Sequence, residues 1–144
     1  MARGFTLVEL LIVLAVFGIL FLIVGTISLN SLPKSQLLVS ADQAEQTLRR
    51  AQALSVDRRA DSVWGVHLTA GDMTLFAGET YVGRDVSYDE VTAFPAGISV
   101  SGLTDVLFAI RTGKTQNTGA ITLTSDATGE TEVLVINSAG SVDK

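Results

Sequence analysis

The feature that most constrains this chain is a long uncharged run near its start, from Leu10 to Leu32, which follows a single glutamate, Glu9. Every residue from Leu10 to Val24 is apolar or glycine. As a helix, residues 5–29 would be about 37 Å long at ~1.5 Å per residue, which is enough to cross a hydrocarbon core of about 30 Å. The run therefore predicts a single membrane-spanning helix.

Two other interpretations of the run fit less well. A buried helix of a soluble domain needs a core on all sides, and a chain of 144 residues is too small to supply one. A secretory signal that starts at Arg3 would be interrupted by Glu9, and its best cleavage pattern is the weak Val24-Gly25-Thr26. Glu9 itself needs an explanation, because a carboxylate costs about 2.5–3.5 kcal/mol at the bilayer centre and less near an end. Its candidate partners are Arg3 and an amine that cleavage of the chain would create.

Residues 3–11, Arg-Gly-Phe-Thr-Leu-Val-Glu-Leu-Leu, resemble the processing site of type IV pilins and of the pseudopilins of type II secretion. The resemblance implies that residues 1–4 are a leader peptide and that a prepilin peptidase cuts between Gly4 and Phe5. It also implies that Phe5 is then N-methylated and that Glu9, at the family's hallmark position, takes part in subunit assembly. The leader departs from the family pattern because it is short and has one basic residue.

The chemistry of these residues agrees with the resemblance. An α-amino group has a pKa of about 8, so a new terminus at Phe5 would be mostly cationic at neutral pH. Phe5 and Glu9 are four residues apart and lie on one face of a helix, so their charges can pair within a chain. The resemblance implies a second arrangement, in which Glu9 of one subunit meets the Phe5 amine of its neighbour in a helical filament.

The resemblance also implies a location. It places the chain in the inner membrane as a single-pass protein, with the N-terminus in the cytoplasm and the C-terminal domain in the periplasm. The distribution of cations does not favour this orientation, because Arg3 alone precedes the run while Lys34, Arg49 and Arg50 follow it. On this point the resemblance decides our prediction.

Past the run, over residues 33–60, the pattern is that of an amphipathic helix. Pro33 predicts a kink where this helix continues from the membrane-spanning and filament-core part, residues 5–32. Apolar and small residues then recur at helical spacing and predict a buried stripe, made of Leu37, Ala41, Ala44, Leu48, Ala51 and Ser55.

Residues 61–144 contain short apolar runs separated by turn residues, which is typical of strands. We predict strands at 63–68, 73–76, 98–101, 106–110, 121–124, 132–137 and 141–142, with turns at 70–71 and 138–140 and an acidic loop over 78–95. One long helix followed by these strands predicts an α+β class, with the helix packed on an antiparallel β-sheet or a small β-sandwich. The resemblance makes this a pilin-like fold. The segments Trp64–Leu68, Leu75–Tyr81 and Pro95–Ile98 are also similar to the minor pseudopilin called general secretion pathway protein H.

Several patterns in this β-rich part predict no site. Gly113-Lys114-Thr115 ends like a phosphate-binding loop, but Phe108 stands where the first glycine is needed, so we expect a hairpin loop at 112–119. Asp85, Asp89 and Glu90 offer oxygen ligands for calcium, but their spacing matches no known ligand loop. His67 is the one histidine and there is no cysteine. We therefore expect no metal site, no cofactor and no enzyme activity.

Charge argues against nucleic acid as a partner. Residues 34–144 carry nine Lys and Arg against fourteen Asp and Glu, a net charge of −5, whereas binding of phosphates needs clustered cations. The leading hypothesis is a minor subunit of a type II secretion pseudopilus, with other pilins or pseudopilins, a prepilin peptidase, an inner-membrane assembly platform and membrane lipid as partners. The alternatives are a minor subunit of a type IV pilus, for adhesion, motility or DNA uptake, and a membrane-anchored binding domain that does not polymerise.

Overall fold

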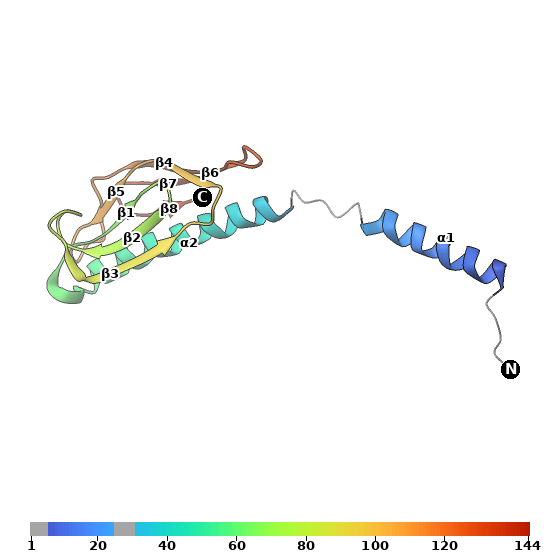
Figure 1. The fold of residues 1–144 in the computed structure, drawn as a ribbon. Coiled ribbons are helices and arrows are strands. Elements are labelled where there is room, and N and C mark those ends of the chain that lie inside the picture. Colours follow the sequence, from blue (N-terminus) through green and yellow to red (C-terminus); the bar gives the residue numbers. More distant parts are fainter. Residues whose placement is uncertain (1–5, 25–30) are drawn as a thin grey trace. The chain divides into compact units, whose positions relative to one another are not determined.

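The computed structural model describes residues 6–24 and 31–144 (Figure 1). The chain divides into two units, at residues 1–31 and 32–144. Helix α1 (Leu7–Val24) lies in the first. Within the described ranges, no helix combines the length and the apolar character that crossing a membrane requires. The predicted leader at 1–4, and residues 5 and 25–30 of the predicted span at 5–32, lie outside the described residues.

Helix α2 (Ser31–Val56) leads into the second unit. Pro33 lies in its first turn, two residues after its start. A proline is tolerated there because the first N–H groups of a helix have no acceptor within it. The predicted continuation from the membrane-spanning part runs through residues 25–30, which lie outside the described residues. α2 ends at Val56, a few residues earlier than predicted. Arg58 leaves the helical region with a φ of 56°, and a short 3₁₀ turn, η1 (Arg59–Asp61), follows.

The stripe predicted along α2 is confirmed as its buried face. All six members are at most 2 % exposed: Leu37, Ala41, Ala44, Leu48, Ala51 and Ser55. The apolar members join one core with side chains from both sheets, among them Val66, Phe108 and Ile121. α2 therefore forms one wall of the core and is not an appendage.

Two four-stranded antiparallel sheets form the rest of the unit. The first has the order β3 (Asp85–Ala93), β2 (Asp72–Ala77), β1 (Trp64–Leu68) and β5 (Asp105–Phe108). The second has the order β4 (Ile98–Gly102), β6 (Gly119–Ser125), β7 (Thr131–Ile136) and β8 (Val142–Asp143). The α+β class is confirmed, with two sheets sharing the core with α2. Of the alternatives left open by the sequence, the two-sheet arrangement is the one present (Figure 1).

Two loop predictions are wrong. Residues 78–95 were expected to be a loop, but β3 occupies 85–93 and is the longest strand in the described residues. It lies at a sheet edge and is exposed along most of its length. Val86 and Tyr88 alternate with Asp85, Ser87 and Asp89, which is a strand signal, but the acidic residues favoured a loop. Residues 112–119 are not a hairpin loop, because β5 pairs with β1 while β6 pairs with β4 and β7. The segment instead connects the two sheets.

The hairpins predicted at 70–71 and 138–140 are confirmed. β1 pairs with β2 from Leu68↔Met73 outward, and β7 pairs with β8 at Ile136↔Val142. Glycine is required near the second turn, because Gly140 has a φ of 82° and a Cβ there would collide with the carbonyl oxygen of Gly113. That contact ties the last hairpin to the connection between the sheets.

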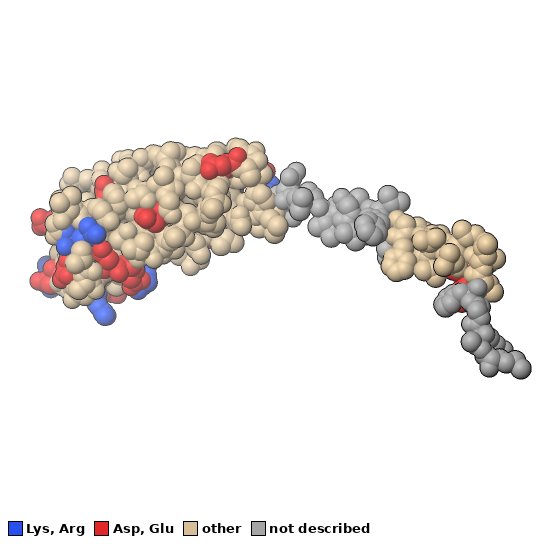
Figure 2. Space-filling model, in the orientation of Figure 1, with Lys and Arg blue, Asp and Glu red and all other residues tan. Residues whose placement is uncertain are grey.

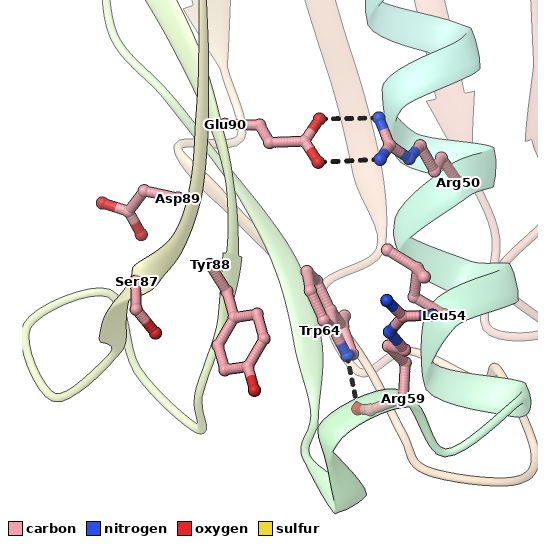
Figure 3. A pocket seen from close by; sticks show the side chains of 8 residues that line it. All are labelled: Arg50, Leu54, Arg59, Trp64, Ser87, Tyr88, Asp89 and Glu90. Carbon is pink, nitrogen blue, oxygen red and sulfur yellow. Dashed lines mark hydrogen bonds and ion pairs between the residues drawn. The ribbon is translucent and has the colours of Figure 1, made fainter.

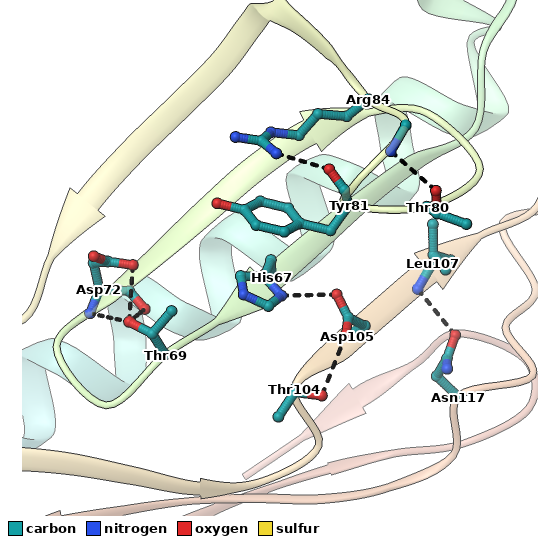
Figure 4. Close-up of polar contacts among 11 residues, drawn as sticks. His67, Thr69, Asp72, Thr80, Tyr81, Arg84, Thr104, Asp105, Leu107 and Asn117 are labelled. Carbon is teal, nitrogen blue, oxygen red and sulfur yellow. Dashed lines mark hydrogen bonds and ion pairs between the residues drawn. The ribbon is translucent and has the colours of Figure 1, made fainter.

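Residues 78–84 fold back over the outer face of the first sheet. The Tyr81 ring stacks on the His67 ring with centroids 3.7 Å apart (Figure 4). The Tyr81 and Phe76 rings form a T-shaped pair with centroids 5.4 Å apart. Arg84 lies 3.8 Å over the Tyr81 ring. Gly65 makes room for the Phe76 ring on this face, because a Cβ at residue 65 would lie 3.0 Å from Phe76 Cζ and 2.8 Å from the Val106 carbonyl oxygen. The middle of this sheet is therefore covered on both faces.

Candidate functional site

The site predicted from sequence is the N-terminal segment, and the structure describes one part of it. Gly4 and Phe5, the predicted cleavage and methylation residues, lie outside the described residues. Glu9, the predicted assembly residue, lies exposed in the first turn of α1. Its position places a carboxylate at the positive end of the helix dipole, where negative charge is favoured by about 0.3–1 kcal/mol.

Thr6 caps this helix, a role that our sequence reasoning missed. The Glu9 N–H donates to the Thr6 hydroxyl at 3.3 Å, and the Thr6 carbonyl accepts from the Glu9 and Leu10 N–H groups at 3.1 and 3.3 Å. The signal was present in the sequence, because Thr-x-x-Glu before an apolar run is the spacing of a capping box. Residues 6–9 thus fix the start of α1 immediately after the predicted cleavage point.

The side chains that α1 presents are apolar and exposed. Over residues 7–19, every residue is exposed and Glu9 alone is charged. The large apolar side chains range from 43 % exposed at Val13 to 75 % at Leu7. The surface of α1 in Figure 2 is correspondingly almost free of charge. An apolar surface of this extent marks contact with lipid or with other proteins. Such a helix, with one carboxylate at its first turn, can pack beside copies of itself in an apolar medium.

The three acidic residues considered as calcium ligands already have partners: an arginine in two cases and Ser87 in the third. Asp89 pairs with Arg84 at 2.8 Å, and both Glu90 oxygens accept from Arg50 at 2.6 and 2.7 Å. Asp85 accepts from the hydroxyl and the N–H of Ser87, which together hold the pKa of the Asp85 carboxyl below its ordinary value. The three carboxylates therefore have separate partners and do not converge.

His67 and the Gly-Lys-Thr segment have structural contacts of their own. His67 Nδ1 lies 2.8 Å from an Asp105 oxygen, and Tyr81 covers its ring (Figure 4). In the segment, the Gly113 N–H donates to the Ala109 carbonyl and the Lys114 N–H to the Thr112 hydroxyl. Those N–H groups are therefore not turned toward a common centre, as a phosphate-binding loop requires.

One comparison with known proteins bears on the N-terminal segment. Residues 1–25 match the family model described as the prokaryotic N-terminal methylation motif. No solved structure matches the chain. The match includes Gly4, Phe5 and Glu9 and ends before the body, residues 32–144. The chain therefore carries a type IV pilin-like methylation motif at its N-terminus.

Proposed function

We propose that this chain is a minor pseudopilin, a structural and non-catalytic subunit of a type II secretion pseudopilus. The observation that carries the proposal is the methylation motif at residues 1–25, within which α1 has exposed side chains that are apolar except for Glu9. In this proposal a prepilin peptidase cuts between Gly4 and Phe5, Phe5 is methylated, and α1 waits as part of a span in the inner membrane. An assembly platform then moves it into a filament of similar subunits.

Glu9 has a defined part in this proposal. Because α1 begins at Leu7, the amine of a new terminus at Phe5 would lie next to the first helical turn, which carries Glu9. The amine of one subunit and the Glu9 carboxylate of its neighbour can then pair inside an apolar bundle, where an unpaired charge is costly. The pair would set both the attraction between subunits and their axial offset.

The body supports a structural role. Helix α2 packs along both sheets, so a displacement of the helix would move the body with it. The order of residues in Trp64–Leu68, Leu75–Tyr81 and Pro95–Ile98 favours the general secretion pathway protein H type among minor pseudopilins. We further propose that the body faces the periplasm and the N-terminus the cytoplasm.

The test of processing is the mass of the mature chain. After expression with a prepilin peptidase, the N-terminal peptide should begin at Phe5 and carry one added methyl group. Gly4→Val should block cleavage, whereas Ala2→Val places the same side chain elsewhere in the leader and should leave cleavage intact. An unmodified Met1 in the wild-type chain, or a start near Ile27, would overturn the proposal.

A DNA-binding assay distinguishes the proposed pseudopilin from one alternative, a subunit of a type IV pilus that takes up DNA. With a net charge of −5 over residues 34–144, we expect no salt-sensitive shift of duplex DNA at micromolar protein. A shift that weakens as salt rises would favour the DNA-uptake alternative. An anchored domain that never polymerises would keep its activity when cleavage at Gly4 is blocked, and this outcome would favour the third alternative.

A further inference from the structure

A small hollow lies where the end of α2, the η1 turn and two strands of the first sheet meet (Figure 3). It has a volume of about 270 Å³, enough for a single side chain of a ligand. Charged side chains of both signs gather at this end of the body (Figure 2). All of its lining residues fall between 50 and 90, so it belongs to the body alone.

The floor of the hollow is apolar and aromatic. Trp64 is buried, and its ring meets the Tyr88 ring edge-on with centroids 5.7 Å apart. The indole N–H of Trp64 already donates to the Arg59 carbonyl at 2.8 Å, so a ligand need not satisfy it. Leu54 of α2 completes the apolar side. A bulky apolar side chain therefore fits against Trp64, Tyr88 and Leu54 without leaving a buried polar group unpaired.

The two arginines that line the hollow, Arg50 and Arg59, differ in whether they form an ion pair. Arg50 forms a two-bonded pair with Glu90, at 2.6 and 2.7 Å. Asp89 points away from α2 and is held by Arg84 (Figure 3). Arg59 has no ion-pair partner among the described residues, although its side chain lines the hollow. A guanidinium of this kind offers two parallel donors, which match a carboxylate.

A strained turn holds Arg59 in place. Arg58, Ala60 and Asp61 have φ values of 56°, 57° and 47°, in the left-handed region that residues other than glycine rarely adopt. They are three of the four such non-glycine residues in the described chain. An ion pair between Arg58 and Asp61 at 2.6 Å spans the turn. Strain of this kind persists where surrounding contacts impose it, and it gathers at binding sites.

We propose that the hollow binds a short acidic peptide segment of a partner protein. In this arrangement a bulky apolar side chain of the segment lies against Trp64 and Tyr88, and a neighbouring Asp or Glu carboxylate pairs with Arg59. A doubly charged phosphate fits less well, because Arg50 is already paired with Glu90 and Arg59 alone of the lining cations has no ion-pair partner among the described residues. β3 supports an extended peptide as the ligand, because it is an edge strand whose outer side pairs with no described strand.

The probe is a blocked peptide, acetyl-Gly-Phe-Asp-Gly-amide, titrated into the full chain in mild detergent. Trp64 is the only tryptophan, so its fluorescence reports on the hollow directly. We expect a saturable change with the Asp peptide. The same peptide with Asn in place of Asp should bind about tenfold more weakly, because it loses a hydrogen-bonded charge pair. The version with Ala in place of Phe should also bind more weakly.

Matched arginine variants locate the contact. Arg59→Gln should weaken binding of the Asp peptide about tenfold and leave the Asn peptide unchanged. Arg49→Gln is the control, because it removes the same charge from the chain but at a residue that pairs with Glu45, outside the hollow. Equal binding of the Asp and Asn peptides, equal binding by Arg59→Gln, or no saturable change at about 10 mM peptide would each overturn the proposal. Cleavage and assembly play no part in this test, so its failure leaves the proposed function untouched.

Discussion

At the scale of single residues, Ser55 joins the end of α2 to the start of β1. Its hydroxyl accepts the backbone N–H of Trp64 at 2.9 Å, and the residue is fully buried. Ser55→Ala leaves that N–H buried without its partner, so we expect a loss of about 1–3 kcal/mol in the free energy of unfolding. Urea unfolding of the full chain in mild detergent, followed by Trp64 fluorescence, measures this loss.

Ser40→Ala is the matched control for that measurement. Ser40 is equally buried on the same helix, but its hydroxyl only donates to the Gln36 carbonyl, one turn earlier, at 2.8 Å. Its removal orphans no N–H group, so we expect a change within about 0.5 kcal/mol. If the two variants lose the same stability, the hydrogen bond to Trp64 does not hold the helix to the sheet.

The sequence could predict that Ser55 faces the core, but not what it does there. Its position in the stripe follows from helical spacing, which is local. The turn at residues 58–61 brings Trp64, the partner of Ser55, near. This turn has left-handed backbone but contains no glycine, so the sequence does not indicate it. The hollow around Arg59 depends on the same turn, and for that reason sequence reasoning missed it.

At the scale of elements, local patterning again separates what was predictable from what was not. The stripe of α2 and the two hairpins were predictable, because neighbours in sequence decide them. β3 was missed although Val86 and Tyr88 alternate with Asp85, Ser87 and Asp89, because exposed acidic residues are typical of a loop. The assignment of β5 and β6 to different sheets was not predictable, because pairing between distant strands leaves no mark in the loop that joins them.

The first residue of β3 is Asp85, whose carboxylate is stabilised by Ser87 two residues later. Two hydrogen bonds from Ser87, the hydroxyl first and then the N–H, lower the pKa of Asp85 from its ordinary value of 3.8. Ser87→Ala removes the hydroxyl, so the pKa of Asp85 should rise toward that value and stay below it, because the N–H remains. A carboxyl-carbon NMR titration between about pH 2 and 6 measures the shift.

The sign of the effect on stability follows from the lowered pKa. The contribution of Asp85 is present above the ordinary pKa and is lost as pH falls through the lower value of the folded state. Ser99→Ala serves as the control, because Ser99 donates to Asp126 instead. If Asp85 titrates at the same pH in the wild type and in Ser87→Ala, the hydroxyl does not stabilise its charge.

At the scale of the whole molecule, the N-terminal unit and the body differ in the kind of side chains they carry. The described side chains of α1 are apolar except for Glu9, whereas the core and the ion pairs given above lie in residues 32–144. The body can therefore fold around its own core, while α1 has exposed apolar surface to bury elsewhere. The motif at residues 1–25 suggests that the partners include other pilins.

Glu9 decides whether charge takes part in that association. Glu9→Ala removes a carboxylate that is costly in a bilayer, so insertion into the membrane should be unchanged or improved. Assembly should weaken, because the amine of a neighbouring Phe5 loses its partner and remains unpaired in the bundle. The fraction of the chain in sedimentable filaments, relative to the fraction in the membrane, measures both effects.

Thr6→Val separates pairing from capping. It keeps the shape of Thr6 and the Glu9 carboxylate but removes the hydroxyl that accepts the Glu9 N–H, which weakens the start of the helix by about 0.5–2 kcal/mol. If Glu9 acts through its charge, Glu9→Ala and Glu9→Gln should both assemble less than the wild type, while Thr6→Val should assemble normally. If Thr6→Val fails to the same degree, the contribution of Glu9 is to the start of α1. Normal assembly of Glu9→Ala would exclude both roles, because neither the pair nor a favourable charge at the helix start survives that substitution.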